Sequence, residues 1–190
     1  MSGSKQTLRI IGGQWRRRRL HFPAIRGLRP TGDRIRETVF NWLQAYVPGA
    51  HCLDLFAGSG AMGLEAASRG AARVVMVERS RPAYQALLAH RELLDANMVE
   101  IVCDDARRFL RRPPQRFDIV FLDPPFQSDI IGACCKMLEE EGWLAPNAHI
   151  YLELDKATPL PPLPATWEII REQGAGQVTF RLARRRAPEE

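Results

Sequence analysis

The sequence predicts an α/β fold, with a doubly wound and mostly parallel sheet of seven strands that ends in an antiparallel hairpin. A basic N-terminal hairpin and a helix precede this sheet. Three observations predict it. Short apolar runs alternate with helical stretches from residue 51 onward, a glycine-rich turn follows the first run, and two extended runs joined by glycines close the chain. We divide the 190 residues into a basic extension over 1–48 and a main domain over 49–190.

The extension begins with two short apolar stretches, Leu8 to Ile11 and Leu20 to Phe22. Two glycines and a run of arginines separate them, which predicts a hairpin with a strongly basic surface. Apolar residues then recur at helical spacing from Ile35 to Tyr46, before Pro48 and Gly49. This pattern predicts an amphipathic helix.

The main domain contains five apolar runs that predict parallel strands, with four helical stretches between them. The strands are Cys52 to Phe56, Arg73 to Val77, Val99 to Cys103, Phe117 to Leu122 and His149 to Leu154. The helices are Gly60 to Arg69, Pro82 to Asp95, Ala106 to Arg111 and Ile130 to Glu140.

The proline-rich stretch over residues 159–164 predicts an extended connector, because its prolines exclude a helix. Trp167 to Arg171 and Gln177 to Leu182 follow, joined through Gly174 and Gly176. Their spacing predicts a hairpin, so we expect the end of the sheet to be antiparallel.

Composition indicates a globular protein without a membrane segment. Hydrophobic residues make up 45%, mean hydropathy is -0.25, and no apolar run approaches the ~18 residues of a transmembrane helix. The first residues lack the apolar core of a secretory signal, so we expect a cytoplasmic protein. The four cysteines have neither metal-site spacing nor a nearby histidine pair, which favours buried thiols over a metal site or disulfides.

Charge is distributed unevenly along the chain. Residues 1–36 hold ten Lys and Arg and one acid, for +9, whereas the remaining 154 residues carry -4. Such a basic segment suits a polyanionic partner, and a solvated arm that only aids solubility is the alternative.

The turn after the first strand of the main domain carries Gly58, Gly60 and Gly63, which match G-x-G-x-x-G. Glu78 ends the next strand, where its carboxylate can accept both hydroxyls of a ribose. This pattern allows a nicotinamide dinucleotide, another adenosine cofactor, or a tight turn that merely needs glycine.

Acidic residues beside this turn distinguish the cofactors. Asp54 lies near the end of the first strand, where it would attract an ammonium group and repel a pyrophosphate. Asp105, after the third strand, can accept from an adenine amine, while Asp104 is better interpreted as a helix cap or loop residue. Together these acids suit S-adenosylmethionine, which has an ammonium, ribose hydroxyls and an adenine amine but no phosphate.

The run Asp123-Pro124-Pro125-Phe126 directly follows an apolar strand. The two prolines fix the backbone, so that the Asp123 carboxylate and the Pro124 carbonyl become two rigid acceptors for an NH2 group. Holding both hydrogens of a nucleobase amine can direct its lone pair toward an electrophilic methyl, and Phe126 can stack on an extruded base. A simple strand-ending turn is the alternative.

Phe56 to Gly60 together with the D-P-P-F run resembles class I S-adenosylmethionine-dependent amino-methyltransferases. Three N-terminal blocks, Ile10 to Arg16, Arg29 to Thr31 and Asp33 to Leu43, are similar to the RsmD family, as are Gly142 to Leu144 and Ala175 to Val178. That family methylates N2 of a guanine in bacterial 16S ribosomal RNA. The chain departs from it at Arg17 and Arg18, where a glycine-containing W-R-G-R-type run is expected.

The resemblance implies a Rossmann-like class I methyltransferase that acts on 16S rRNA or the 30S subunit in ribosome biogenesis, without a metal. It implies a catalytic set and a cofactor set, the latter including the turn residues. The catalytic set is Asp123, Pro124 and Phe126, and the cofactor set is Asp54, Phe56, Gly58, Gly60, Glu78 and Asp105. We expect Arg16, Arg17, Arg18, Arg19, Arg29, Arg34 and Arg36 to contact RNA phosphates.

Other functions stay open at this stage. Adenine N6 in DNA suits D-P-P-F equally, although no segment is large enough for a separate duplex-reading domain. A nicotinamide oxidoreductase has only the glycine spacing in its favour. A ribosome-assembly factor without catalysis would bind RNA and no S-adenosylmethionine. We favour a monomer.

Overall fold

The computed structural model describes residues 5–25, 28, 31–125 and 130–187. Two strands, β1 (Lys5–Arg9) and β2 (Arg19–Pro23), form an antiparallel hairpin, and α1 (Asp33–Trp42) follows. The predicted hairpin and helix of the extension are therefore present. The remaining elements are β3 (His51–Asp54), α2 (Ala61–Ser68), β4 (Arg73–Glu78), α3 (Arg81–Leu93), β5 (Val99–Cys103), α4 (Ala106–Phe109), β6 (Phe117–Leu122), α5 (Ile130–Glu140), β7 (Leu144–Asp155), β8 (Trp167–Ala175) and β9 (Val178–Arg185).

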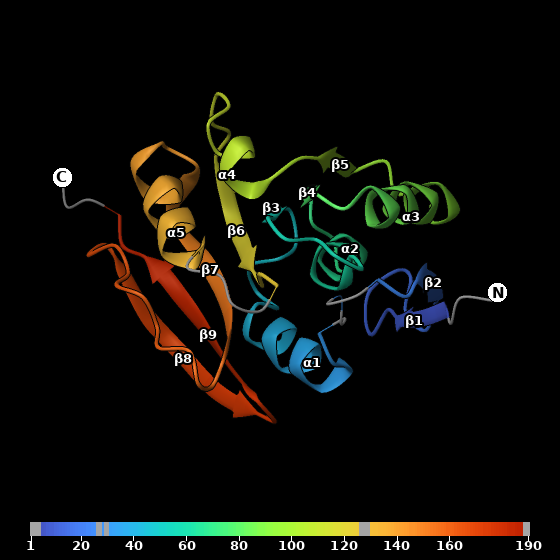
Figure 1. The fold of residues 1–190 in the computed structure, drawn as a ribbon, viewed down its shortest axis with the longest axis horizontal. Helices are drawn as coiled ribbons and strands as arrows, with labels where there is room; N and C mark the ends of the chain where they lie inside the picture. The colour runs from blue at the N-terminus through green and yellow to red at the C-terminus, as the bar shows by residue number, and fades with distance from the viewer. Residues whose placement is uncertain (1–4, 26–27, 29–30, 126–129, 188–190) are drawn as a thin grey trace.

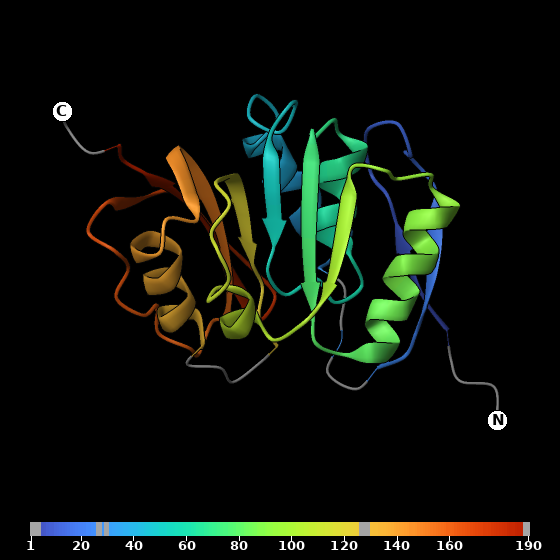
Figure 2. The same ribbon diagram turned by 90° about the horizontal axis from the view of Figure 1, so that it is seen from above.

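The central sheet has seven strands in the order β5-β4-β3-β6-β7-β9-β8. Pairing is parallel from β5 to β7, whereas β9 runs antiparallel to both β7 and β8. The predicted fold class is confirmed. Chain order reverses between β3 and β6, which is where ligands bind in doubly wound sheets. The arrowheads of β3, β4 and β6 point to one common edge in Figure 2, and every predicted site acid of the main domain lies at that edge.

Helices cover both faces of the sheet (Figure 1). On one face, α4 and α5 bury Phe109 and Leu138 against Leu122 and Leu152. On the other face, α1, α2 and α3 pack with the hairpin, whose four inward residues share one cluster with the sheet. Those hairpin residues are Leu8, Ile10, Leu20 and Phe22. The basic extension thus forms part of the same hydrophobic core as β3 and β4.

A close backbone contact fixes the hairpin loop on α2. Gly13 has a φ of 76°, and a Cβ there would lie 1.9 Å from the carbonyl oxygen of Ser68. Gln14 N–H donates to that same carbonyl oxygen at 2.8 Å, and Trp15 N–H donates to the Ser68 hydroxyl at 3.0 Å. Only glycine permits this approach.

Most element bounds differ from the sequence prediction by one to three residues, and those of β7, α1 and β8 differ by more. β8 continues to Ala175 rather than ending at Arg171. β7 begins at Leu144 rather than at His149, because Leu144 pairs with Phe117 before the register shifts. Asn147 within this stretch has a φ of 61°. α1 ends at Trp42 and not near Tyr46, because turns occupy the residues that lead to Pro48.

Candidate functional site

The glycine turn joins β3 to α2 at the point where the strand order reverses. Gly58 has a φ of 54° and Gly60 a φ of 86°, both in the left-handed region. A Cβ at Gly60 would lie 2.8 Å from Leu87 and 2.9 Å from Leu64. Glycine at position 60 therefore meets both a backbone and a packing requirement, and the first N–H groups of α2 point toward the strand ends.

Glu78 braces this turn from the end of β4. Its Oε2 accepts from Gly58 N–H at 2.8 Å and its Oε1 accepts from Ser80 N–H at 2.7 Å. The side chain is half-buried. Because each carboxylate oxygen has two lone pairs, these bonds fix the orientation of Glu78 and leave acceptor capacity for a ligand above the turn.

Asp54 is buried at the end of β3, against the first turn of α2. Only 2% of the residue is exposed, and its Oδ2 accepts from Gly63 N–H at 2.9 Å. Burial, with a smaller contribution from the Glu78 charge, raises the pKa of Asp54 to about 7 against the opposing effect of the Gly63 hydrogen bond. A cation above the turn would favour the ionised carboxylate.

The cap of α4 is Asp105 rather than Asp104. Asp105 caps α4, because its Oδ1 accepts from the N–H groups of Arg107 and Arg108 at 3.0 and 3.3 Å. Asp104, interpreted as the cap, instead forms ion pairs with Arg112 at 2.5 Å and Arg108 at 3.5 Å. Asp105 is half-buried and remains able to face a ligand at this edge.

Asp123 follows β6, the strand beside β3. Its Oδ2 accepts from the hydroxyl of Thr31 at 3.0 Å. Leu122 pairs with Leu152 in the register of β6 and β7, so Asp123 and Glu153 follow at the same level on adjacent strands, which lie about 4.8 Å apart. Burial and the neighbouring Glu153 raise the pKa of Asp123, and the Thr31 hydrogen bond lowers it.

Three carboxylates thus lie on neighbouring strands near this edge: Asp54 is the last residue of β3, Asp123 follows β6 and Glu153 lies on β7. The Tyr151 hydroxyl donates to Glu153 at 2.6 Å, and burial raises the pKa of Glu153. Among the described residues no Lys or Arg forms an ion pair with any of the three. This edge therefore favours cations and hydrogen-bond donors, and it disfavours a pyrophosphate.

The remaining predicted residues of this site are placed as follows. Phe56 is half-buried in the glycine turn and packs against the α4–α5 face of the sheet. Pro124 is half-buried beside Asp123. Phe126 lies outside the described residues. Among the described residues no group of three or more His, Cys, Asp or Glu side chains could hold a metal ion, and none of the described helices is long and apolar enough to cross a membrane.

The structure describes six of the predicted RNA-contacting arginines, and all of them except Arg36 are exposed. Arg16, Arg17 and Arg18 are exposed in the loop between β1 and β2, and Arg19 is exposed at the start of β2. Arg34 is exposed on α1, and Arg29 lies outside the described residues. Arg16 to Arg19 lie together at the hairpin loop, and their exposed guanidinium groups can reach a polyanion.

The prediction for Arg36 is wrong. Only 1% of this residue is exposed, and its guanidinium donates to the Thr31 carbonyl at 3.1 Å and pairs with Asp33 at 2.6 Å and Glu65 at 3.3 Å. Burial lowers the pKa of Arg36, while Glu65 and Asp33 raise it. A fully enclosed guanidinium has no surface for a phosphate, so Arg36 has a structural role.

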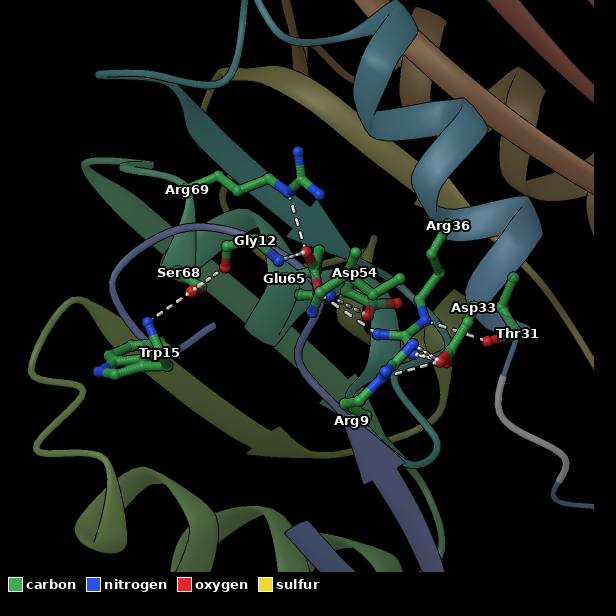
Figure 3. A network of polar contacts seen from close by, with 12 residues as sticks. Arg9, Gly12, Trp15, Thr31, Asp33, Arg36, Asp54, Glu65, Ser68 and Arg69 are labelled. Carbon is green, nitrogen blue, oxygen red and sulfur yellow. Dashed lines mark hydrogen bonds and ion pairs between the residues drawn. The ribbon is translucent and has the colours of Figure 1, made fainter. Parts of the chain in front are cut away.

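Glu65 forms the centre of a polar network that the sequence did not reveal (Figure 3). This side chain has no exposed surface, and it accepts from Ile11 N–H at 3.0 Å, Gly12 N–H at 2.8 Å and Arg69 at 2.9 Å. With Arg36 it ties the hairpin loop and α1 to α2. Four donors around one carboxylate satisfy a charge that would otherwise be costly to bury.

The departure from the expected W-R-G-R-type run also has a structural outcome. Arg17 has a φ of 70°, one of three described non-glycine residues with a positive φ. This is the position at which the resemblance places a glycine. The turn therefore keeps the left-handed conformation and holds an arginine in it.

A family model described as Conserved hypothetical protein 95 matches residues 8–184. The Escherichia coli (strain K12) Ribosomal RNA small subunit methyltransferase D is 48% identical over 189 residues, covering 100% of this chain and 95% of the relative. The chain belongs to the RsmD family. The Haemophilus influenzae protein of the same name is 41% identical over 94% of each chain.

Solved structures agree with the RsmD family fold. Escherichia coli yhhF superposes with a TM-score of 0.90 at 44% identity, covering 96% of this chain and 99% of that chain. A Thermus thermophilus 16S rRNA N2 G1207 methyltransferase, RsmC, in complex with AdoMet and guanosine, has a TM-score of 0.70 at 22% identity. It covers 98% of this chain and 52% of that chain, and at this identity the likeness concerns the fold alone.

Sequence reasoning missed three residues of this region: Thr31, Glu65 and Glu153. Thr31 lies in a block that the family resemblance includes, but nothing in the pattern indicates that it contacts Asp123, 92 positions later. Glu65 lies on the first helix after the glycine turn and reads as a surface acid. The alternation of Tyr151 and Glu153 on one strand face was the only available signal for Glu153.

Proposed function

We propose that this protein transfers a methyl group from S-adenosylmethionine to the exocyclic N2 amine of a guanine in 16S ribosomal RNA. One observation carries the proposal: the Asp123-Pro124 acceptors directly follow β6, the strand beside β3 and its glycine turn, at the reversal of the sheet order. The names of the RsmD relatives support the RNA substrate. An rRNA substrate also implies a cytoplasmic enzyme.

The turn and its acids fit the cofactor. Gly58 and Gly60 let the backbone approach the methionyl part, and Phe56 lines the turn. Glu78 would accept hydrogen bonds from the ribose hydroxyls and Asp105 from the adenine amine. The charge of the buried Asp54 would attract the ammonium group. Among the described residues no Lys or Arg pairs with Asp54, Asp123 or Glu153, which favours this positively charged donor over a dinucleotide.

The cofactor supplies an already activated methyl group, so the protein has mainly to position the acceptor. Asp123 and the Pro124 carbonyl would accept the two hydrogens of the guanine amine and turn its lone pair toward the methyl. The amine becomes much more acidic once it is methylated, and its proton can then pass to Asp123 or to water. Phe126 would stack on the base.

Labelled S-adenosylmethionine tests the proposal. The protein is incubated with naked 16S RNA, with 30S particles, or with adenine-containing duplex DNA, and the modified base is mapped. We expect N2-methylguanine in one of the two RNA substrates. Label in DNA adenine would support the adenine-N6 alternative, and RNA binding without cofactor binding would indicate an assembly factor.

Two substitutions of Asp123 test the catalytic role. Asp123→Ala should retain binding of both ligands and lose most of the transfer rate, because the carboxylate acts during reaction. Asp123→Asn keeps one acceptor oxygen, so measurable activity would indicate orientation, and activity as low as that of Ala would indicate a required base. A near-wild-type rate for Asp123→Ala in single-turnover assays would remove Asp123 from the mechanism.

A further inference from the structure

Thr31 has no role in the chemistry proposed above, yet its side chain contacts Asp123, the proposed catalytic carboxylate. Thr31 is 7% exposed, and its hydroxyl donates to Asp123 Oδ2 at 3.0 Å. No other described side chain donates a hydrogen bond to this carboxylate. The contact joins the segment before α1 to the end of β6, across 92 positions of sequence.

A buried network holds the backbone of Thr31 in place (Figure 3). The Thr31 carbonyl accepts from Arg36 Nε at 3.1 Å, and the guanidinium of Arg36 is itself fixed between Asp33 and Glu65. Glu65 belongs to α2, the helix that follows the glycine turn. Thr31 is therefore anchored to the same helix that starts at the cofactor turn, and its hydroxyl is fixed relative to both parts of the site.

We infer that Thr31 is a positioning residue for Asp123, which holds Oδ2 so that Oδ1 faces the guanine amine. This inference rests on the proposed function. A carboxylate with one oxygen held has a single productive orientation, whereas a free one rotates about its terminal torsion. Positioning of the acceptor is what this reaction requires of the protein.

The surroundings of Asp123 show why a donor is needed there. Glu153 faces it from β7 and Asp54 from β3, and both are acidic; Tyr151 on β7 donates its hydroxyl to Glu153 instead. Burial and these acids raise the pKa of Asp123, and the Thr31 hydrogen bond lowers it. Thr31 thus favours the ionised carboxylate, the form that can accept from an amine on either oxygen.

Thr31→Val tests the inference, because it removes the hydroxyl and keeps the shape, and Thr31→Ser is the matched control that keeps the hydroxyl. Single-turnover rates are measured at saturating RNA and cofactor between pH 5.5 and 8.5. We expect the Val variant to react about tenfold more slowly at neutral pH, the effect of one charge-assisted hydrogen bond. Its acidic limb should move to higher pH, with unchanged affinity for both ligands, and Ser should restore rate and limb.

A second measurement does not depend on activity. The carboxyl carbon of Asp123, followed by ¹³C NMR in the ligand-free protein, should titrate at higher pH in Thr31→Val than in the wild type. Thr31→Ala gives the same readout should the Val variant not fold. A Val or Ala variant with the wild-type rate, pH profile and Asp123 titration would overturn the inference.

The outcomes separate this inference from the function on which it rests. If the wild type transfers no methyl to RNA, or if Asp123→Ala is fully active, the proposed function fails. If the wild type is active, Asp123→Ala is inactive and Thr31→Val behaves as wild type, only the role of Thr31 fails.

Discussion

Arg34 and Arg36 lie two residues apart on α1 and carry the same charge, but Arg34 is exposed and Arg36 is buried. We expect Arg36→Met to destabilise the fold and to leave the salt dependence of RNA binding unchanged. Arg34→Met should leave the stability of the fold unchanged and weaken the salt dependence of RNA binding. Methionine keeps a long unbranched side chain, so each variant loses a guanidinium and little apolar volume.

The magnitude for Arg36 follows from its partners. Removing one member of a buried ion network costs about 3–5 kcal/mol, because the remaining charges are left uncompensated. Glu65 keeps Arg69 at 2.9 Å and two backbone N–H donors, so we expect the lower end, about 3 kcal/mol. For a chain of this size, that loss corresponds to about 6–12 °C in melting temperature. Arg34→Met should change stability by less than about 0.5 kcal/mol.

Urea unfolding of both variants, together with RNA binding at several salt concentrations, measures both effects. The slope of log affinity against log salt should fall by ~0.7–0.9 for Arg34→Met, the effect of one phosphate contact. The reasoning is refuted if Arg36→Met lowers the free energy of unfolding by less than about 1 kcal/mol. The cost of burying the guanidinium would then be about as large as the stabilisation from its ion pairs. An equal change of salt slope in both variants would refute the assignment of Arg36 to structure.

Three further predictions follow from single residues or short runs. Arg17→Gly should raise the free energy of unfolding by up to about 1 kcal/mol, because glycine adopts the left-handed conformation of this position without strain, whereas Arg17→Ala should give no increase. Equal stability of the two variants in urea would contradict this. The affinity for S-adenosylmethionine should rise between pH 6 and 7.5, as Asp54 ionises near its pKa of about 7. Methylthioadenosine has no ammonium group, so its affinity should not rise. Calorimetry that shows the same pH dependence of affinity for both ligands would contradict the role of Asp54. Replacing Arg16 to Arg19 with Gln should flatten the salt dependence of RNA binding without changing cofactor affinity, and Arg171→Gln with Arg186→Gln serves as a charge control whose slope should stay at the wild-type value.

Much of the fold was predictable because apolar runs and turn signals coincide. The bounds of β5, β6 and α5 match the sequence prediction, since each is a largely apolar segment that ends at acidic residues. The start of β7 was not predictable in this way. Its first residues include Pro146 and Asn147, which favour turns, and they join the strand only because Leu144 pairs with Phe117.

The candidate site was predictable as a set of strand ends, and less so as individual roles. Parallel strands bring Asp54, Glu78 and Asp123 to one edge whatever the details of packing. The roles of adjacent acids depend on three-dimensional contacts. Asp105 rather than Asp104 caps α4, because Arg112, in the segment after α4, pairs with Asp104. No local pattern contains that contact.

Charge counting along the chain overestimates the basic surface of residues 1–36. Its +9 includes Arg36, which is neutralised by Glu65 from the acidic remainder of the chain, and Arg9, which pairs with Asp33 at 2.8 Å. The positive field is therefore concentrated at the tip of the hairpin, where Arg16 to Arg19 are exposed together. Because the loop of that hairpin is fixed to α2 through Glu65, a phosphate bound in the loop would be held at a set distance from the cofactor turn. The same network anchors Thr31 against Asp123, so the proposed RNA-docking loop and the proposed catalytic carboxylate are both held by one buried set of contacts.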